Sequence, residues 1–259
     1  MNAAVLGNGF LGKAFKREGF TVLGKSDFHI PLNDTLIDYN VLAPYDVIIN
    51  CIGKSNTRWC EQNFEAALFS NAYIPKLLSS YCKTHGKRFV HISSGCLYDG
   101  ADKDNIEDNF IAAHCNYTVT KWAGEQFCCP DDLILRPRLF FGDFQDKNNL
   151  LCKLYRFGKF LQETNSYSSV HDIVCACQAL LREEQTGIFN VACSGSLTLQ
   201  DFAKLLDIDA VNTIEVEELH KQENLYLVNN TMNLDKLKQY YAPVDVTQEI
   251  LRCKELLNN

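Results

Sequence analysis

No run of residues in this 259-residue sequence is long, apolar and uncharged enough to form a membrane-spanning helix. The first residues, Met1 to Gly7, have no basic segment before a short apolar run, so we expect no secretory signal and a cytoplasmic location. Basic clusters are also lacking and the net charge is −7, which argues against nucleic acid or a membrane surface as the main partner. What is present, 46% hydrophobic and 22% charged residues, is typical of a globular protein.

Twelve cysteines are present, but their spacing does not indicate a metal site. Cys128 and Cys129 are adjacent, Cys175 and Cys177 are two positions apart, and no C-x-x-C pair with a matching partner occurs. We therefore expect reduced, mostly buried thiols and no bound metal. Cys96 is the exception considered below.

Short apolar runs alternate with helical patterns along the first 140 residues. The runs are near-continuous rather than alternating, as in a parallel sheet covered on both faces. Strand and helix in alternation predict a doubly wound α/β sheet of the Rossmann type. The expected strands are 3–6, 20–23, 46–51, 88–92, 133–135 and 187–191. The expected helices are 10–17, 64–83, 117–127, 148–157 and 170–181. A further helix is expected to be capped by residues 196–198 and to end at residue 206.

The segment Gly7-Asn8-Gly9-Phe10-Leu11-Gly12 follows the first expected strand and opens the first expected helix, so it matches G-x-G-x-x-G in its proper context. The first glycine permits the tight turn, the second lets the backbone approach a pyrophosphate, and the third lets helix and strand pack closely. The helix N-terminus then faces the phosphate charge. All six residues are predicted to bind a dinucleotide cofactor.

Two residues after the second strand bear on which cofactor binds. Asp27 has the spacing expected of the acid that binds the ribose of NAD. Lys25 is closer to the strand end, and a cation there favours the 2′-phosphate of NADP. We expect NADPH with Lys25 at its phosphate. NADH remains an alternative, as does a solvated surface role for Lys25.

A second motif, Tyr117 and Lys121 in Y-x-x-x-K, has the spacing that places both side chains on one face of a helix. An ammonium beside a phenol lowers the phenol pKa from about 10, which would make Tyr117 a proton donor to a carbonyl under reduction. Lys121 can also hold the nicotinamide ribose. Ser94 follows the strand that ends at Ile92, where ligands bind in open α/β sheets, and is placed to hydrogen-bond the same carbonyl.

In these motifs the chain resembles the extended short-chain dehydrogenases/reductases, in particular the dTDP-4-dehydrorhamnose reductases and, more closely, the plant bifunctional nucleotide-rhamnose synthase/epimerase-reductases. The resemblance implies reduction of a 4-keto sugar nucleotide by NADPH or NADH. It also places Cys51, Ile52 and Gly53, after Asn50, along the cofactor, and Asn71 in contact with the cofactor near the active site. The matching segments are 7–12, 50–53, 59–61, 94–98, 117–121 and 135–138.

The same resemblance gives Cys96 a role, because a cysteine stands here in the bifunctional enzymes and in GDP-fucose synthases, whereas simple reductases usually have an aromatic residue. Epimerisation moves an acidified proton on carbon 3 or 5 of the sugar to the opposite face, which needs an acid/base group beside the ring. If the chain is extended, Ser94 and Cys96 share a side, and a cation such as Lys121 makes a thiol usable near neutral pH. The alternative is one more buried cysteine.

Substrate contacts are expected from three residues, Asn56, Arg138 and Asn149. Arg136 and Arg138 follow a strand end, and one of them can bind a diphosphate. Asn149 lies where the resembled family contacts substrate, and Asn56 follows the third strand. His171, a candidate for the histidine partner of the fucose synthases, is interpreted as a structural residue at a helix start.

We therefore predict a bifunctional 3,5-epimerase/4-reductase that converts a nucleotide-4-keto-6-deoxyhexose, preferably UDP-linked, to an L-rhamnose-type sugar nucleotide. Residues 1–145, with 166–192 returning to them, would form the NAD(P)-binding Rossmann domain, and 146–165 with 193–259 a small C-terminal substrate-binding domain. Two alternatives stay open: a reductase without epimerase activity, and a non-catalytic subunit resembling the regulatory subunit of methionine adenosyltransferase. A homodimer is compatible with the resemblance, and the sequence leaves open the nucleotide and the substituent on carbon 2.

Overall fold

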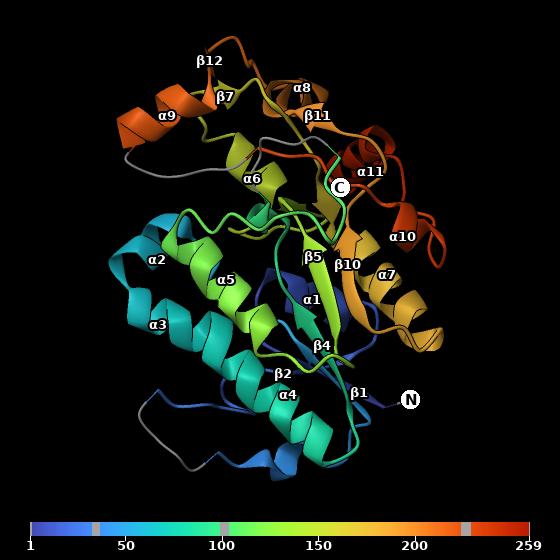
Figure 1. Ribbon diagram of the computed structural model, residues 1–259. Helices are drawn as coiled ribbons and strands as arrows, with labels where there is room; N and C mark the ends of the chain where they lie inside the picture. The colour runs from blue at the N-terminus through green and yellow to red at the C-terminus, as the bar shows by residue number, and fades with distance from the viewer. Residues whose placement is uncertain (1, 33–36, 99–103, 224–228, 259) are drawn as a thin grey trace. The chain divides into compact units, whose positions relative to one another are not determined.

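The computed structural model describes residues 2–32, 37–98, 104–223 and 229–258 (Figure 1). The chain forms two compact units. The first consists of residues 1–97, 113–136 and 184–189, and the second of residues 98–112, 137–183 and 190–259. Neither unit is one continuous segment of the chain.

The first unit is organised around a six-stranded sheet with the order β10-β5-β4-β3-β1-β2. Strand β1 pairs in parallel with β2 and β3, β3 with β4, and β4 with β5. This arrangement confirms the predicted doubly wound sheet of the Rossmann type. The strands are β1 Ala3–Leu6, β2 Thr21–Leu23, β3 Val47–Asn50, β4 Arg88–Ile92, β5 Leu133–Pro137 and β10 Gly187–Val191.

The register of these strands brings their carboxyl ends to one edge. Leu6 at the end of β1 pairs with Asn50 at the end of β3, and Asn50 pairs with His91 of β4. The segments that follow β1, β3 and β4 therefore leave the sheet side by side. They contain the glycine-rich loop, Gly53 and Ser94, which is why sheet topology alone gathers most of the predicted site.

Helices cover the sheet of the first unit. Figure 1 shows α3, α4 and α5 in front of the sheet and α1 behind it. The predicted helix over 64–83 is confirmed but is interrupted by a π-helical turn, η2. The helical segments are α1 Phe10–Arg17, α2 Thr57–Gln62, α3 Phe64–Leu68, η2 Phe69–Tyr73, α4 Ile74–Thr84 and α5 Asn116–Gln126, with short 3₁₀ turns at η1 Tyr39–Leu42 and η3 Gly95–Leu97.

The second unit is built from three two-stranded pairings and six helices within the described residues. Its core includes the buried Phe141, Leu154, Tyr167, Phe202 and Ile250. Helix α6 is shorter than the expected 148–157. The pairs are β6 Phe140–Phe141 with β9 Ser168–Ser169, β7 Phe160–Leu161 with β12 Thr213–Ile214, and β8 Thr164–Asn165 with β11 Leu197–Thr198; the helices are α6 Leu150–Leu154, α7 Val170–Arg182, α8 Leu199–Leu205, α9 Val216–Glu223, α10 Asp235–Lys238 and α11 Val246–Asn258.

Within the described ranges, every helix is too short or too polar to cross a lipid bilayer.

Candidate active site

The three glycines of the loop after β1 meet three different steric demands. Gly7 has a φ of +104°, which favours glycine, and a Cβ on it would lie 3.1 Å from the backbone of Cys51. A Cβ on Gly12 would lie 1.9 Å from the carbonyl oxygen of Gly7, so α1 can pack against the loop only without a side chain here. Gly9, by contrast, is exposed, has open space where a Cβ would be, and begins α1 without a side-chain cap. A helix N-terminus facing open space is a suitable position for an anion.

The turn after β2 contains both residues considered for cofactor choice. Asp27 Oδ2 accepts a 2.8 Å hydrogen bond from the backbone N–H of Gly24, so the carboxylate closes this turn. Lys25 is exposed in the same turn. The lysine therefore points its charge into solvent while the acid has a local structural partner.

Asn50 and His91 shape the segment that follows β3. The side-chain amide of Asn50 lies 3.3 Å from Nδ1 of His91, and its oxygen accepts a 3.0 Å bond from the backbone N–H of Ile52. Burial, and then the charge of Lys121, hold the pKa of His91 well below 6.5, so the ring is neutral and Nδ1 accepts the amide proton. This pair fixes the direction of the chain through Cys51 to Gly53.

Asn71 connects that segment to α5. It is fully buried in the π-helical turn η2, and such turns occur often at functional sites. Its side chain accepts a 2.7 Å bond from Lys54 N–H and donates to the Lys54 carbonyl at 3.0 Å and to Thr120 Oγ1 at 3.0 Å. The observed contacts of Asn71 thus hold the loop and the helix together, and its predicted contact with the cofactor stays a prediction.

Ser94, Cys96 and Tyr117 come together, but not in the way predicted. The segment after Ser94 is the 3₁₀ turn η3 rather than extended chain, so the expectation that Ser94 and Cys96 share a side of a strand is wrong. Instead the turn folds back, and Ser94 Oγ accepts a 3.1 Å bond from the backbone N–H of Cys96. Ser94 also hydrogen-bonds the phenol of Tyr117, and the Cys96 thiol lies close enough to act on it electrostatically.

The pKa of Tyr117 is raised, first by burial and then by the neighbouring Cys96, while the hydrogen bond from Ser94 opposes this. The pKa of Tyr117 is therefore not lowered in the chain alone, contrary to the prediction, because burial has the largest effect on it. The Lys121 ammonium has a different hydrogen-bond partner. Lys121 Nζ donates a 2.6 Å hydrogen bond to the carbonyl oxygen of Ile92, and burial lowers the pKa of this lysine to about 8.

Lys121 lies close to the loop after β3 as well. A Cβ on Gly53 would be 4.0 Å from its Nζ. One turn further along α5, Glu125 forms a buried ion pair with Arg136, with Oε2 to Nη2 at 2.6 Å and Oε1 to Nε at 2.9 Å. Of the two arginines considered for binding the diphosphate, Arg136 therefore already has an ion-pair partner on α5.

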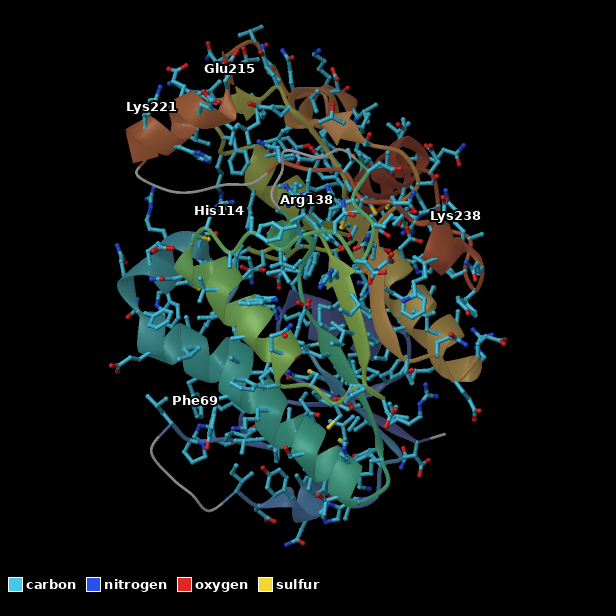
Figure 2. The ribbon with its side chains drawn as sticks, viewed as in Figure 1. Phe69, His114, Arg138, Glu215, Lys221 and Lys238 are labelled. Atoms are coloured by element: carbon cyan, nitrogen blue, oxygen red, sulfur yellow. The ribbon has the colours of Figure 1, made fainter. Side chains whose placement is uncertain are left out.

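The predicted substrate residues have structural partners. Asn56, exposed in the first unit, caps α2 by accepting a 2.8 Å bond from Trp59 N–H. In the second unit, Arg138 is buried and its Nε donates to Asn165 Oδ1 at 3.2 Å (Figure 2). The amide of Asn149 makes four bonds to the backbone: its nitrogen donates to Gly142 and Phe144, and its oxygen accepts from Gly142 and Leu151. These bonds favour a structural role for Asn149.

Two contributors to the site were not predicted. Glu61 Oε1 accepts a 2.7 Å bond from the backbone N–H of Asn116, which holds the start of α5 one residue before Tyr117. Gly124 lets α5 approach the π-helical turn, since a Cβ there would lie 2.2 Å from the carbonyl oxygen of Asn71. No sequence signal distinguishes this glycine from an ordinary helical one, because the demand comes from a neighbouring helix.

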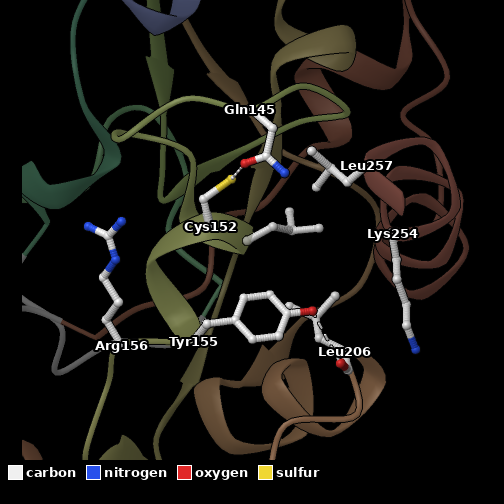
Figure 3. Close-up of a pocket in the computed structure, with 8 residues that line it drawn as sticks. Gln145, Cys152, Tyr155, Arg156, Leu206, Lys254 and Leu257 are labelled. Carbon is white, nitrogen blue, oxygen red and sulfur yellow. Dashed lines mark hydrogen bonds between the residues drawn. The ribbon is translucent and has the colours of Figure 1, made fainter. Parts of the chain in front are cut away.

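A cavity of about 210 Å³ lies in the second unit and contains none of the predicted site residues (Figure 3). Its lining consists of Gln145, Leu151, Cys152, Tyr155, Arg156, Leu206, Lys254 and Leu257.

A glycine-rich loop at the start of α1, a Y-x-x-x-K helix and a serine after β4, all in one Rossmann-type unit, define an extended short-chain dehydrogenase/reductase. The particular family follows from comparison with known proteins. The family model described as RmlD substrate binding domain matches residues 5–224, and the chain belongs to that family. The resemblance inferred from the sequence is thereby confirmed.

Curated relatives are reductases and multifunctional enzymes. The chain is 28% identical over 235 residues to the probable low-salt glycan biosynthesis reductase of Haloferax volcanii, covering 79% of this chain and 78% of that protein. It is 22% identical over 269 residues to the bifunctional dTDP-4-dehydrorhamnose 3,5-epimerase/dTDP-4-dehydrorhamnose reductase of Arabidopsis thaliana, covering 96% and 87%. A trifunctional UDP-glucose 4,6-dehydratase/3,5-epimerase/reductase of the same plant is 23% identical over 271 residues, but the chain spans only 39% of its length.

Solved structures show the same fold. A dTDP-4-dehydrorhamnose reductase of Clostridium acetobutylicum has a TM-score of 0.87 with 21% identity, and all of both chains is covered. The dTDP-4-dehydrorhamnose reductase of Bacillus anthracis, solved in complex with NADP, has a TM-score of 0.82 with 18% identity, covering 96% of this chain and 97% of the other.

Proposed function

We propose that this protein reduces a nucleotide-linked 4-keto-6-deoxyhexose with NADPH and also epimerises carbons 3 and 5 of the sugar, giving an L-rhamnose-type product. The observation that carries the proposal is the hydrogen bond between Tyr117 and Ser94, one turn of α5 from Lys121, with the backbone N–H of Cys96 donating to the same Ser94 hydroxyl. Family membership and the reductase relatives support the reduction. The bifunctional plant relative supports the epimerisation.

The residues around the glycine-rich loop fit NADPH. Open space at Gly9 leaves room for a pyrophosphate at the N-terminus of α1, and a side chain there would occupy it. The exposed Lys25 would contact the 2′-phosphate, while Asp27 is used in the turn. Cys51 to Gly53 would line the nicotinamide side, and bound NADPH would supply the hydride. The NADP complex of the Bacillus anthracis relative supports this choice of cofactor.

Tyr117 would donate the proton to the oxygen on carbon 4. Because burial raises its pKa, the phenol keeps its proton in the resting site, as an acid must. Ser94 would hold the same oxygen by a hydrogen bond. Lys121, whose pKa is about 8, carries a charge at neutral pH that can contact the cofactor ribose while Ile92 fixes its position.

Cys96 would carry the proton in epimerisation. Its sulfur would take the proton from carbon 3 or 5 beside the carbonyl that Tyr117 and Ser94 hold, and Lys121 would assist the return of a proton to the opposite face. The location of Cys96 in the turn η3 and its electrostatic effect on Tyr117 support this role. The half-exposed state of Cys96 is compatible with access by a substrate.

The experiment is an assay of NADPH oxidation with UDP- and dTDP-linked 4-keto-6-deoxyhexose, the UDP form being the favoured substrate. A Tyr117→Phe variant should lower kcat by roughly 10²–10⁴-fold while NADPH binding persists. Full activity in that variant would remove Tyr117 from the mechanism. NADPH binding without turnover of either nucleotide would favour the non-catalytic alternative, a subunit of the methionine adenosyltransferase type.

A further inference from the structure

Helix α7 of the second unit carries a cysteine–histidine pair that the proposed function does not use. His171 and Cys175 are one turn apart, so their side chains share a face of the helix. The sulfur of Cys175 lies 3.6 Å from Nε2 and 3.8 Å from Nδ1 of the ring. Both residues are half-buried, so neither side chain is sealed in the core.

Charged groups on α11 surround the pair. Glu249 and Arg252 both act on His171, and Arg252 binds Glu249 by two 2.7 Å bonds and Asp143 at 3.5 Å. The hydrogen bond with Cys175 is the main cause that raises the pKa of His171 to about 9, with Glu249 adding to it and burial and Arg252 opposing it. The raised pKa of His171 favours an imidazolium beside the Cys175 sulfur, and a cation beside a sulfur makes a cysteine more reactive.

Other titratable groups near the pair do not replace His171 as a partner. Tyr241 senses the charge of Cys175, but its hydroxyl donates to Asp172. Burial raises the pKa of Cys193 and of Cys253, which makes both inert as nucleophiles.

Cys152 provides a matched comparison within the same unit. It is half-buried like Cys175 and also lies on a helix, α6. Its thiol, however, contacts the neutral amide oxygen of Gln145 at 3.2 Å (Figure 3). The two cysteines therefore differ in the group that contacts the sulfur, an imidazole at Cys175 and a neutral amide at Cys152.

We propose that Cys175 is a modification site at which hydroperoxides oxidise the thiol to a sulfenic acid, with His171 as its proton partner. The thiolate sulfur attacks one peroxide oxygen, an S–O bond forms and the O–O bond breaks. Sulfur loses two electrons and the peroxide gains them. The departing hydroxide, or the alkoxide from an organic hydroperoxide, takes the proton of the His171 imidazolium and leaves as water or an alcohol.

The test exposes the full-length chain to hydrogen peroxide with dimedone, a trap for sulfenic acids, and follows the peptides of Cys175 and Cys152 by mass spectrometry. We expect Cys175 to be trapped about tenfold faster at pH 6.5, and His171→Gln to remove that advantage. Equal rates for the two cysteines, or an unchanged rate in a folded His171→Gln variant, would overturn the proposal.

A second measurement needs no variant. Alkylation by iodoacetamide from pH 5.5 to 9 should be faster at Cys175 than at Cys152, and the ratio of the two rates should grow as the pH falls. Parallel falls at the two cysteines would contradict a thiolate–imidazolium pair.

Discussion

The ammonium of Lys121 donates a 2.6 Å hydrogen bond to the carbonyl oxygen of Ile92, the last residue of β4. This bond connects α5, the helix that contains Tyr117, to the strand that precedes Ser94. It also keeps a cation in a buried place, where its pKa falls to about 8. Two residues far apart in sequence thus fix the relative positions of the groups proposed to act on the sugar.

The buried ammonium should make the stability of the fold depend on pH. The folded-state pKa of Lys121 is about 8 and the ordinary value 10.5, so between these values the unfolded chain binds more protons and stability rises with pH. We expect the free energy of unfolding, relative to a Lys121→Met variant, to rise by about 2 kcal/mol from pH 7 to pH 9.5. Denaturant unfolding of both proteins at the two pH values measures it, and a constant difference would contradict a buried ammonium.

Low pH should destabilise the fold through His91. Its folded-state pKa lies well below 6.5, so the unfolded chain takes up a proton as the pH falls while the folded chain does not. The neutral ring therefore costs stability below pH 6.5, and this cost grows as the pH falls. In a His91→Gln variant this part of the acid destabilisation should be missing. An unfolding curve whose acid slope is the same in both proteins would show that the ring is protonated in the fold.

The glycine-rich loop offers a matched pair of substitutions. Gly9→Ala places a methyl group in open space, so the free energy of unfolding should change by less than about 1 kcal/mol while NADPH binds at least tenfold more weakly. Gly12→Ala forces a carbon to 1.9 Å from Gly7 O and should destabilise the fold itself. Thermal unfolding and fluorescence titration with NADPH separate the two effects. Unchanged NADPH affinity in Gly9→Ala would remove the loop from the cofactor site.

The sequence predicted the sheet well because local pattern and topology agree there. Residues 3–6, 10–17, 88–92 and 187–191 have the bounds expected from apolar runs and turn signals. Since parallel strands end at one edge, the order of strands and helices along the chain is enough to place the glycine loop and Ser94 together.

What could not be predicted depends on contacts between segments. No local sequence pattern predicts the turn after Ser94, although this turn sets the position of Cys96 relative to Tyr117. The direction of the Tyr117 pKa shift follows first from burial and then from the neighbouring Cys96, both of which depend on the tertiary structure. The hydrogen bonds of the Asn149 side-chain amide could not be predicted from the sequence either, because its partners are backbone groups of one folded loop.

The most direct test of the proposed activity is NMR of the purified protein with UDP-4-keto-6-deoxyglucose in D₂O, with and without NADPH, for the unmodified chain and for Cys96→Ala. We predict deuterium at carbons 3 and 5 and an L-configured reduced sugar when NADPH is present, with deuterium uptake lost in Cys96→Ala. Cys152→Ala, at a half-buried cysteine of the second unit, serves as the control and should behave as the unmodified chain. Reduction without deuterium uptake, or full uptake in Cys96→Ala, would contradict the epimerase role assigned to Cys96.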